Sequence, residues 1–167
     1  DIHHSYNDFD NEDFRKINYD KLADVYFKIF KEFLSKELYT RKEFRYKFEI
    51  VNYTAITEGQ YLPSHSHLGS DDDFAAIHYL NFKDDHILTC FNNPINWAPF
   101  LHDLRPELEN ILNVIHPDNS YMVQNFMFPV QEDDMMIWPS ALNHQIFPQG
   151  PTKEPRITIS TNMKIFP

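Results

Sequence analysis

The stretches WPSALNHQIFP (residues 138–148) and PRITISTN (residues 155–162) carry the clearest structural pattern in the chain. The second stretch alternates polar and mostly apolar residues, which is typical of a β-strand with two different faces. In the first, a Trp-Pro-Ser turn precedes another short β pattern. A third stretch, GQYLPSHSH (residues 59–67), begins with a glycine turn and ends in a short extended segment. Together they indicate short strands joined by turns.

The rest of the chain continues this rhythm without alternating strands and helices. A mainly β fold follows, either a sandwich or a barrel. The count of about eight core strands favours a jelly roll, that is, a double-stranded β-helix. We expect strands at residues 46–56, 74–82, 86–91, 121–128, 135–138, 143–147 and 156–165.

Two helices are expected beside the strands. Apolar residues recur at helical spacing over residues 19–38, which predicts an amphipathic helix packed on the back of a sheet. Pro106 begins a second helical pattern that predicts a short inserted helix before residue 116. The 167 residues predict a single domain, with an N-terminal arm and helix over residues 1–45 and the double-stranded β-helix over residues 46–167.

Composition narrows the class of protein. The net charge of −10, spread along the chain, argues against nucleic acid as a partner. No apolar run approaches the length that spans a membrane. The single cysteine, Cys90, excludes an internal disulfide and is typical of a reducing compartment, so we expect a cytoplasmic protein. The sequence does not determine the oligomeric state.

Three histidines and one arginine are the candidate functional residues. His65 and His67 point to the same side of an extended segment, and His144 lies on a later strand. Three imidazoles on neighbouring strand ends predict a site for one transition-metal ion. Arg156 shares a strand face with Thr158. If that face is inward, the guanidinium requires an anion; the alternative is a surface arginine on an edge strand.

These segments resemble the iron(II)/2-oxoglutarate-dependent oxygenases, and most of all their small prolyl-hydroxylase-like, phage-type members. The stretches at residues 138–148 and 155–162 resemble the C-terminal half of that family. GQYLPSHSH and IHYLN (residues 77–81) resemble the other half, and the likeness covers about residues 50–165. The resemblance implies a dioxygenase that uses Fe(II), 2-oxoglutarate and O2. Such an enzyme hydroxylates a peptidyl (prolyl-like) or small-molecule C–H bond and releases succinate and CO2.

The resemblance also implies roles for individual residues. His65 and His144 match the two metal-binding histidines of the family. Arg156 matches the basic residue that holds the distal carboxylate of 2-oxoglutarate, and Thr158 matches the hydroxyl position two residues later. Tyr53 lies on the strand where many members place a tyrosine that contacts the cosubstrate.

One departure concerns the second metal ligand, which in the family is usually the carboxylate of a His-x-Asp motif. This chain has His67 at that position. Either the imidazole replaces the carboxylate, or a carboxylate from residues 71–73 takes its place. We predict His67 rather than Asp71, because the two-residue spacing from His65 fixes its direction.

Other interpretations remain open. The same histidines, followed by Asp71, resemble a cupin, either a metal-binding protein or a dioxygenase that does not use 2-oxoglutarate; a cupin does not require Arg156. A metal-free sandwich that binds a ligand or partner is a third possibility. Among the other histidines, we expect His78 to be a core residue and His86 to face solvent at a turn.

Overall fold

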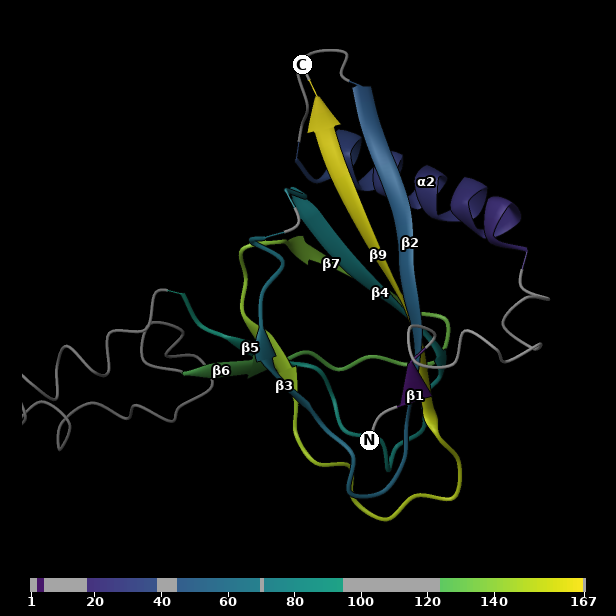
Figure 1. Cartoon of the computed structure of the whole chain (residues 1–167), viewed down its shortest axis with the longest axis vertical. Coiled ribbons are helices and arrows are strands. Elements are labelled where there is room, and N and C mark those ends of the chain that lie inside the picture. The colour runs from purple at the N-terminus through teal and green to yellow at the C-terminus, as the bar shows by residue number, and fades with distance from the viewer. Residues whose placement is uncertain (1–2, 5–17, 39–44, 70, 95–123, 167) are drawn as a thin grey trace, which may run out of the picture.

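The computed structural model describes residues 3–4, 18–38, 45–69, 71–94 and 124–166 (Figure 1). The predicted short helix after Pro106, and the first residues of the strand predicted at 121–128, lie outside this part of the chain. The described residues form one helix and nine strands in two antiparallel sheets. The predicted mainly β jelly-roll fold is therefore confirmed.

Each sheet brings together segments that are distant in sequence. The five-stranded sheet has the order β1 (His3–His4), β2 (Arg45–Ile56), β9 (Arg156–Phe166), β4 (Phe74–Asn81) and β7 (Met135–Pro139). The four-stranded sheet has the order β3 (Leu62–His65), β8 (His144–Ile146), β5 (Cys90–Asn92) and β6 (Asn125–Met127). The long strands β2 and β9 run side by side at the centre of the larger sheet (Figure 1).

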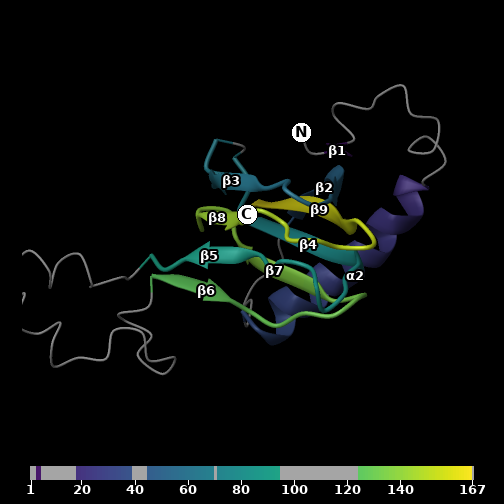
Figure 2. The ribbon, with the colours of Figure 1, turned by 90° about the horizontal axis from the view of Figure 1, so that it is seen from below.

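The helix α2 (Tyr19–Lys36) covers the outer face of the larger sheet, as its spacing predicted (Figure 2). The side chain of Asn18 caps its N-terminus by accepting from the Lys21 backbone N–H at 3.0 Å. Phe30 and Leu34 are buried in an apolar cluster with residues of β4 and β9. Because these strands carry the candidate site on their other face, the helix supports the site from behind.

Strand β9 has the two faces that its alternating sequence predicted. Arg156 lies opposite Ile56 on β2, and Thr158 lies opposite Tyr79 on β4. Tyr79 belongs to the apolar core that also contains Phe91 of the smaller sheet. The polar face of β9 is therefore inward, and the surface-arginine alternative is wrong.

Two local predictions are corrected. The strand expected at residues 86–91 begins only at Cys90, because the Ile87 N–H donates to the Gln149 side chain at 2.9 Å and not to a neighbouring strand. The N-terminal arm, for which the sequence predicts no strand, pairs with β2 at His3–His4. No helix in the described part of the chain is long and apolar enough to cross a membrane.

Candidate metal centre and its cavity

The structure brings together the three histidines that the sequence singled out. His65 ends β3 and lies directly opposite His144, the first residue of β8. His67 follows two residues later, and its backbone N–H donates to the Ser140 carbonyl at 2.9 Å. One ring nitrogen from each histidine lies within 4.8 Å of the other two. This separation suits three ligands that share one metal ion.

Hydrogen bonds fix the tautomers of His65 and His144. Nδ1 of His65 lies 2.9 Å from the Pro63 carbonyl oxygen, and Nδ1 of His144 lies 3.1 Å from the Leu142 carbonyl oxygen. A carbonyl oxygen only accepts, so each Nδ1 carries the proton. Each Nε2 therefore keeps the lone pair that binds a metal.

His67 reaches the same tautomer through side chains. Its Nδ1 lies 3.1 Å from Oδ1 of Asn162, and Nδ2 of Asn162 donates to a carboxylate oxygen of Asp72 at 2.8 Å. All three imidazoles are thus held as Nδ1–H donors to oxygen atoms.

The protein environment also keeps the imidazoles of His67 and His144 uncharged. The pKa of His144 is lowered to about 4, chiefly by burial and to a smaller extent by the neighbouring His65 and His67, while the hydrogen bond to the Leu142 carbonyl opposes the change. Burial, followed by the proximity of His65, lowers the pKa of His67. Both rings are therefore neutral near pH 7, the state in which imidazole binds metal.

The three aspartates that follow this cluster are engaged elsewhere. Asp71 forms an ion pair with Lys164, and its side chain is 86 % exposed. Asp73 accepts from the Ile165 N–H at 2.7 Å. Asp72 bonds to Asn162 and does not enter the cluster. Within the described residues no carboxylate joins the three imidazoles, so the geometry favours His67 over Asp71 as the second ligand.

A cavity connects the histidines with Arg156. It lies between the two sheets and has both polar and apolar walls. Its described lining consists of Val51, Asn52, Thr54, Leu62, His65, His67, Ala76, Ile77, Thr89, Trp138, His144, Ile146, Arg156, Thr158 and Ser160. None of these residues is acidic.

Arg156 lines this cavity and is fully buried. Its Nη2 donates to the Thr89 hydroxyl at 2.9 Å, and the guanidinium carbon lies 5.1 Å from the centre of the Tyr79 ring. Nε and Nη1 have no hydrogen-bond partner among the described residues. A buried cation without a carboxylate partner is costly, so the arrangement is suited to an anionic ligand.

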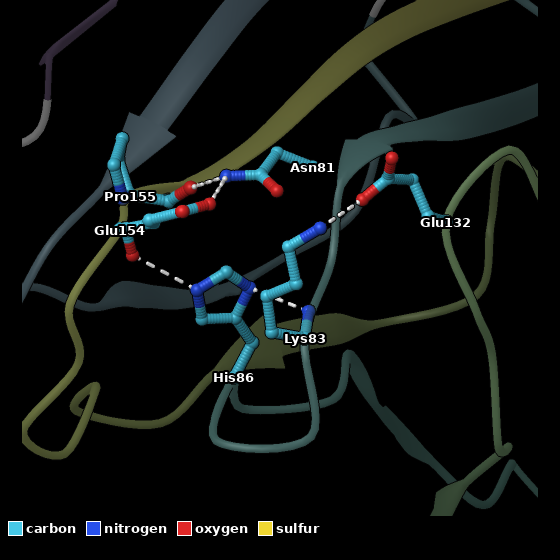
Figure 3. Close-up of polar contacts among 6 residues, drawn as sticks. All are labelled: Asn81, Lys83, His86, Glu132, Glu154 and Pro155. Atoms are coloured by element: carbon cyan, nitrogen blue, oxygen red, sulfur yellow. Dashed lines mark hydrogen bonds and ion pairs between the residues drawn. The ribbon is translucent and has the colours of Figure 1, made fainter.

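A network of side chains fixes the segment that leads into Arg156 (Figure 3). Nδ2 of Asn81 donates to the Pro155 carbonyl at 2.9 Å, and Nε2 of His86 lies 2.9 Å from the Glu154 carbonyl. Nδ1 of His86 accepts from the Lys83 N–H at 3.0 Å, so Nε2 is the donor. His86 is only 5 % exposed, so the prediction that it faces solvent is wrong.

The structure does not place Tyr53 at the cavity. Tyr53 pairs with Ile159, whereas its neighbours Asn52 and Thr54 line the cavity and pair with inward residues of β9. The proposed contact between Tyr53 and a cosubstrate therefore does not fit. The sequence interpretation missed Thr54, because its inward direction follows from its pairing with Thr158 on β9, which the local pattern of β2 does not indicate.

Comparison with known proteins supports the fold. No family model and no curated protein matches the sequence. A crystal structure of a 2OG-Fe(II) oxygenase family oxidoreductase from Burkholderia pseudomallei matches 80 % of this chain at 12 % identity, with a TM-score of 0.52. A Pseudomonas putida prolyl-4-hydroxylase matches 87 % of it at 9 % identity, with a TM-score of 0.50. This chain spans 50 % of the first protein and 64 % of the second.

Identities this low show a shared fold and no more. The predicted resemblance to the iron(II)/2-oxoglutarate oxygenases is confirmed at that level. The chain is a jelly roll with a three-histidine cluster and a buried arginine in one cavity.

Proposed function

We propose that the protein is an oxidoreductase, a dioxygenase that uses Fe(II) and 2-oxoglutarate. The observation that carries the proposal is the cavity in which three Nδ1-protonated imidazoles accompany a buried guanidinium that has no acidic partner among the described residues. His65, His67 and His144 would hold the iron. When bound, the iron supplies the chemistry by which O2 oxidises both 2-oxoglutarate and a substrate C–H bond.

The cosubstrate fits the distribution of charge in the cavity. 2-Oxoglutarate carries two carboxylates, one beside its keto group and one at the other end. The distal carboxylate would bind Nε and Nη1 of Arg156, the donors that have no described partner, in a bidentate contact. Thr158 is buried on the same strand face and would donate a further hydrogen bond. The keto acid end would then face the histidines.

Aromatic side chains pack against the imidazole of His144. The centre of the Trp138 ring lies 4.9 Å from the centre of the His144 ring, in an edge-to-face contact. The centre of the Phe91 ring lies 5.9 Å from that of His144. Trp138 and Phe91 are both almost fully buried. These side chains exclude water and strengthen electrostatic contacts inside the site.

The overall reaction is that of a hydroxylase. One O2 is consumed, 2-oxoglutarate becomes succinate and CO2, and the substrate C–H becomes C–OH, so all atoms balance. A peptidyl substrate of prolyl type is supported by the likeness to a prolyl-4-hydroxylase fold, and a small molecule is the other class considered.

A cupin-type function is the second candidate. It is favoured by the absence of a carboxylate from the described histidine cluster. Such a protein would bind metal alone, or act as a dioxygenase without 2-oxoglutarate. It offers no role for the buried charge of Arg156, which is why we rank it second.

Calorimetry with a redox-inert metal separates the two candidates. The protein is loaded with Zn(II) and titrated with 2-oxoglutarate, and then with glutarate, which lacks the keto oxygen. We expect one 2-oxoglutarate per chain and much weaker binding of glutarate, since glutarate cannot chelate the metal. Binding of Zn(II) without any binding of 2-oxoglutarate would favour the cupin-type function.

A further inference from the structure

A chain of polar side chains leads from the histidine cluster towards the surface. Nδ1 of His67 lies 3.1 Å from Oδ1 of Asn162, whose Nδ2 lies 2.8 Å from Oδ2 of Asp72. Asn162 is 6 % exposed and projects from β9, on the same face as Arg156. These contacts join residues about ninety positions apart in sequence.

The carboxylate of Asp72 determines how the amide of Asn162 is oriented. An ionised carboxylate can only accept hydrogen bonds, so the amide nitrogen must face Asp72. The amide oxygen then faces His67 and accepts from its Nδ1–H. This leaves the lone pair on Nε2 of His67, the nitrogen available to a shared metal.

The backbone around these residues is held in place. The His67 N–H donates to the Ser140 carbonyl at 2.9 Å, and the Ser140 N–H donates to the Asp73 carbonyl at 3.0 Å. The Asp73 N–H donates in turn to the Met163 carbonyl at 2.9 Å. The loop that carries Asp72 is thus joined to β9 and to the segment that carries His67, which brings the three side chains together.

His67 differs in this respect from its two neighbours. His65 and His144 each use a backbone carbonyl two residues earlier in the chain. Only His67 depends on side chains for its tautomer. His67 also stands where the resembled family has a carboxylate ligand. Asp72 supplies a negative charge that is linked to His67 through the side chain of Asn162.

We propose that Asp72 and Asn162 are positioning residues that hold His67 as the second ligand and so set the metal affinity of the site. The inference rests on the proposed metal site. It adds that the carboxylate acts through Asn162 and not as a ligand. Partners of this kind typically change metal affinity by about ten- to one-hundredfold.

Metal affinity is measured with Co(II) alone, by competition against a chromophoric chelator, together with the visible spectrum of bound Co(II). We expect Asn162→Leu and Asp72→Ala to weaken binding by about ten- to one-hundredfold and to change the spectrum. Asp71→Ala is the matched control from the same loop. It should bind as the wild type does, because the exposed Asp71 pairs with Lys164 and not with the cluster.

A swap of the two side chains provides a rescue. Asn162→Asp alone places two carboxylates against each other and should weaken binding. In the double variant Asp72→Asn/Asn162→Asp, the new carboxylate accepts from both the His67 Nδ1–H and the new amide. The swap should therefore recover most of the affinity that each single change loses.

Nitrogen-15 NMR of the metal-free variants distinguishes positioning from general structural support. In the wild type, His67 should appear as the Nδ1–H tautomer, and Asn162→Leu should lose this preference while retaining a folded spectrum. If Asn162→Leu bound Co(II) as tightly as the wild type and kept the same His67 tautomer, the inference would be overturned, but the proposed metal site would stand. A wild type that binds no Co(II), or a His144→Ala variant that binds equally well, would overturn the proposed metal site and the inference with it.

Discussion

The buried guanidinium of Arg156 donates to the hydroxyl of Thr89 at 2.9 Å, a neutral partner for a charged group. Thr89 is 1 % exposed, and its hydroxyl also lies 2.8 Å from the Tyr79 hydroxyl. The described protein thus offers Arg156 hydrogen bonds and an aromatic ring but no countercharge. The hydrogen bond from Arg156 to Thr89 is the basis of the first prediction.

Replacing Thr89 by valine keeps the shape and removes the acceptor. Because Nη2 of Arg156 then joins Nε and Nη1 without a partner, we expect the ligand-free protein to lose about 1–3 kcal/mol of unfolding free energy. Urea denaturation measures this loss. Saturating 2-oxoglutarate should stabilise both proteins, and an unchanged midpoint in the ligand-free variant would show that the contact contributes nothing.

The second prediction concerns the metal ligands. His67→Ala should abolish tight metal binding, because it removes one of three converging imidazoles, and His144→Ala should do the same. His78→Ala is a suitable histidine control, since His78 bonds to Tyr26 at the helix and lies outside the cluster. Metal content after dialysis is the measurement. If His67→Ala retained a full complement of metal, the second ligand would be an aspartate and not His67.

The third prediction is a pH dependence at the contact between helix α2 and the sheet. Nδ1 of His78 lies 2.7 Å from the Tyr26 hydroxyl, and burial raises the pKa of Tyr26 to about 12, so the hydroxyl is the donor. Burial lowers the pKa of His78 below its usual 6.5, and the nearby carboxylate of Asp133 opposes this change. Asp133 is 89 % exposed, so its influence is screened.

The sign follows from the depressed pKa. Above pH 6.5 His78 is neutral in both the folded and unfolded states; as the pH falls below 6.5 the unfolded chain takes up the proton first. Stability should therefore decline as the pH falls from 6.5 towards the folded-state pKa. His67 and His144 titrate in the same direction, so the measurement is the difference between wild type and His78→Gln across that range. Parallel curves for the two proteins would exclude a contribution from His78.

Local periodicity accounts for what the sequence predicted correctly. The alternation in β9 identified its inward face, and the spacing between His65 and His67 predicted their convergence. The pairing of His65 with His144 followed from expecting both on short strands of a jelly roll.

What the sequence did not predict depends on long-range pairing. The face of Tyr53 is set by its register against Ile159, and β2 has an irregularity between Ile50 and Asn52 that a pattern of period two does not reveal. The burial of His86 depends on its contact with the Glu154 carbonyl, which lies 68 positions later in the chain. Asn162 meets His67 across ninety-five positions, a contact that no local spacing indicates.

The most direct measurement is an anaerobic titration of 2-oxoglutarate into the Fe(II)-loaded protein and into its Arg156→Gln variant, followed by the visible charge-transfer band. We expect the wild type to develop the band at one 2-oxoglutarate per chain. The variant should bind iron equally well but bind 2-oxoglutarate more weakly by roughly 2–5 kcal/mol, the cost of losing one partner of a buried charge pair. Equal affinities would remove Arg156 from the site, and the absence of a band in the wild type would contradict the assignment as a 2-oxoglutarate-dependent dioxygenase.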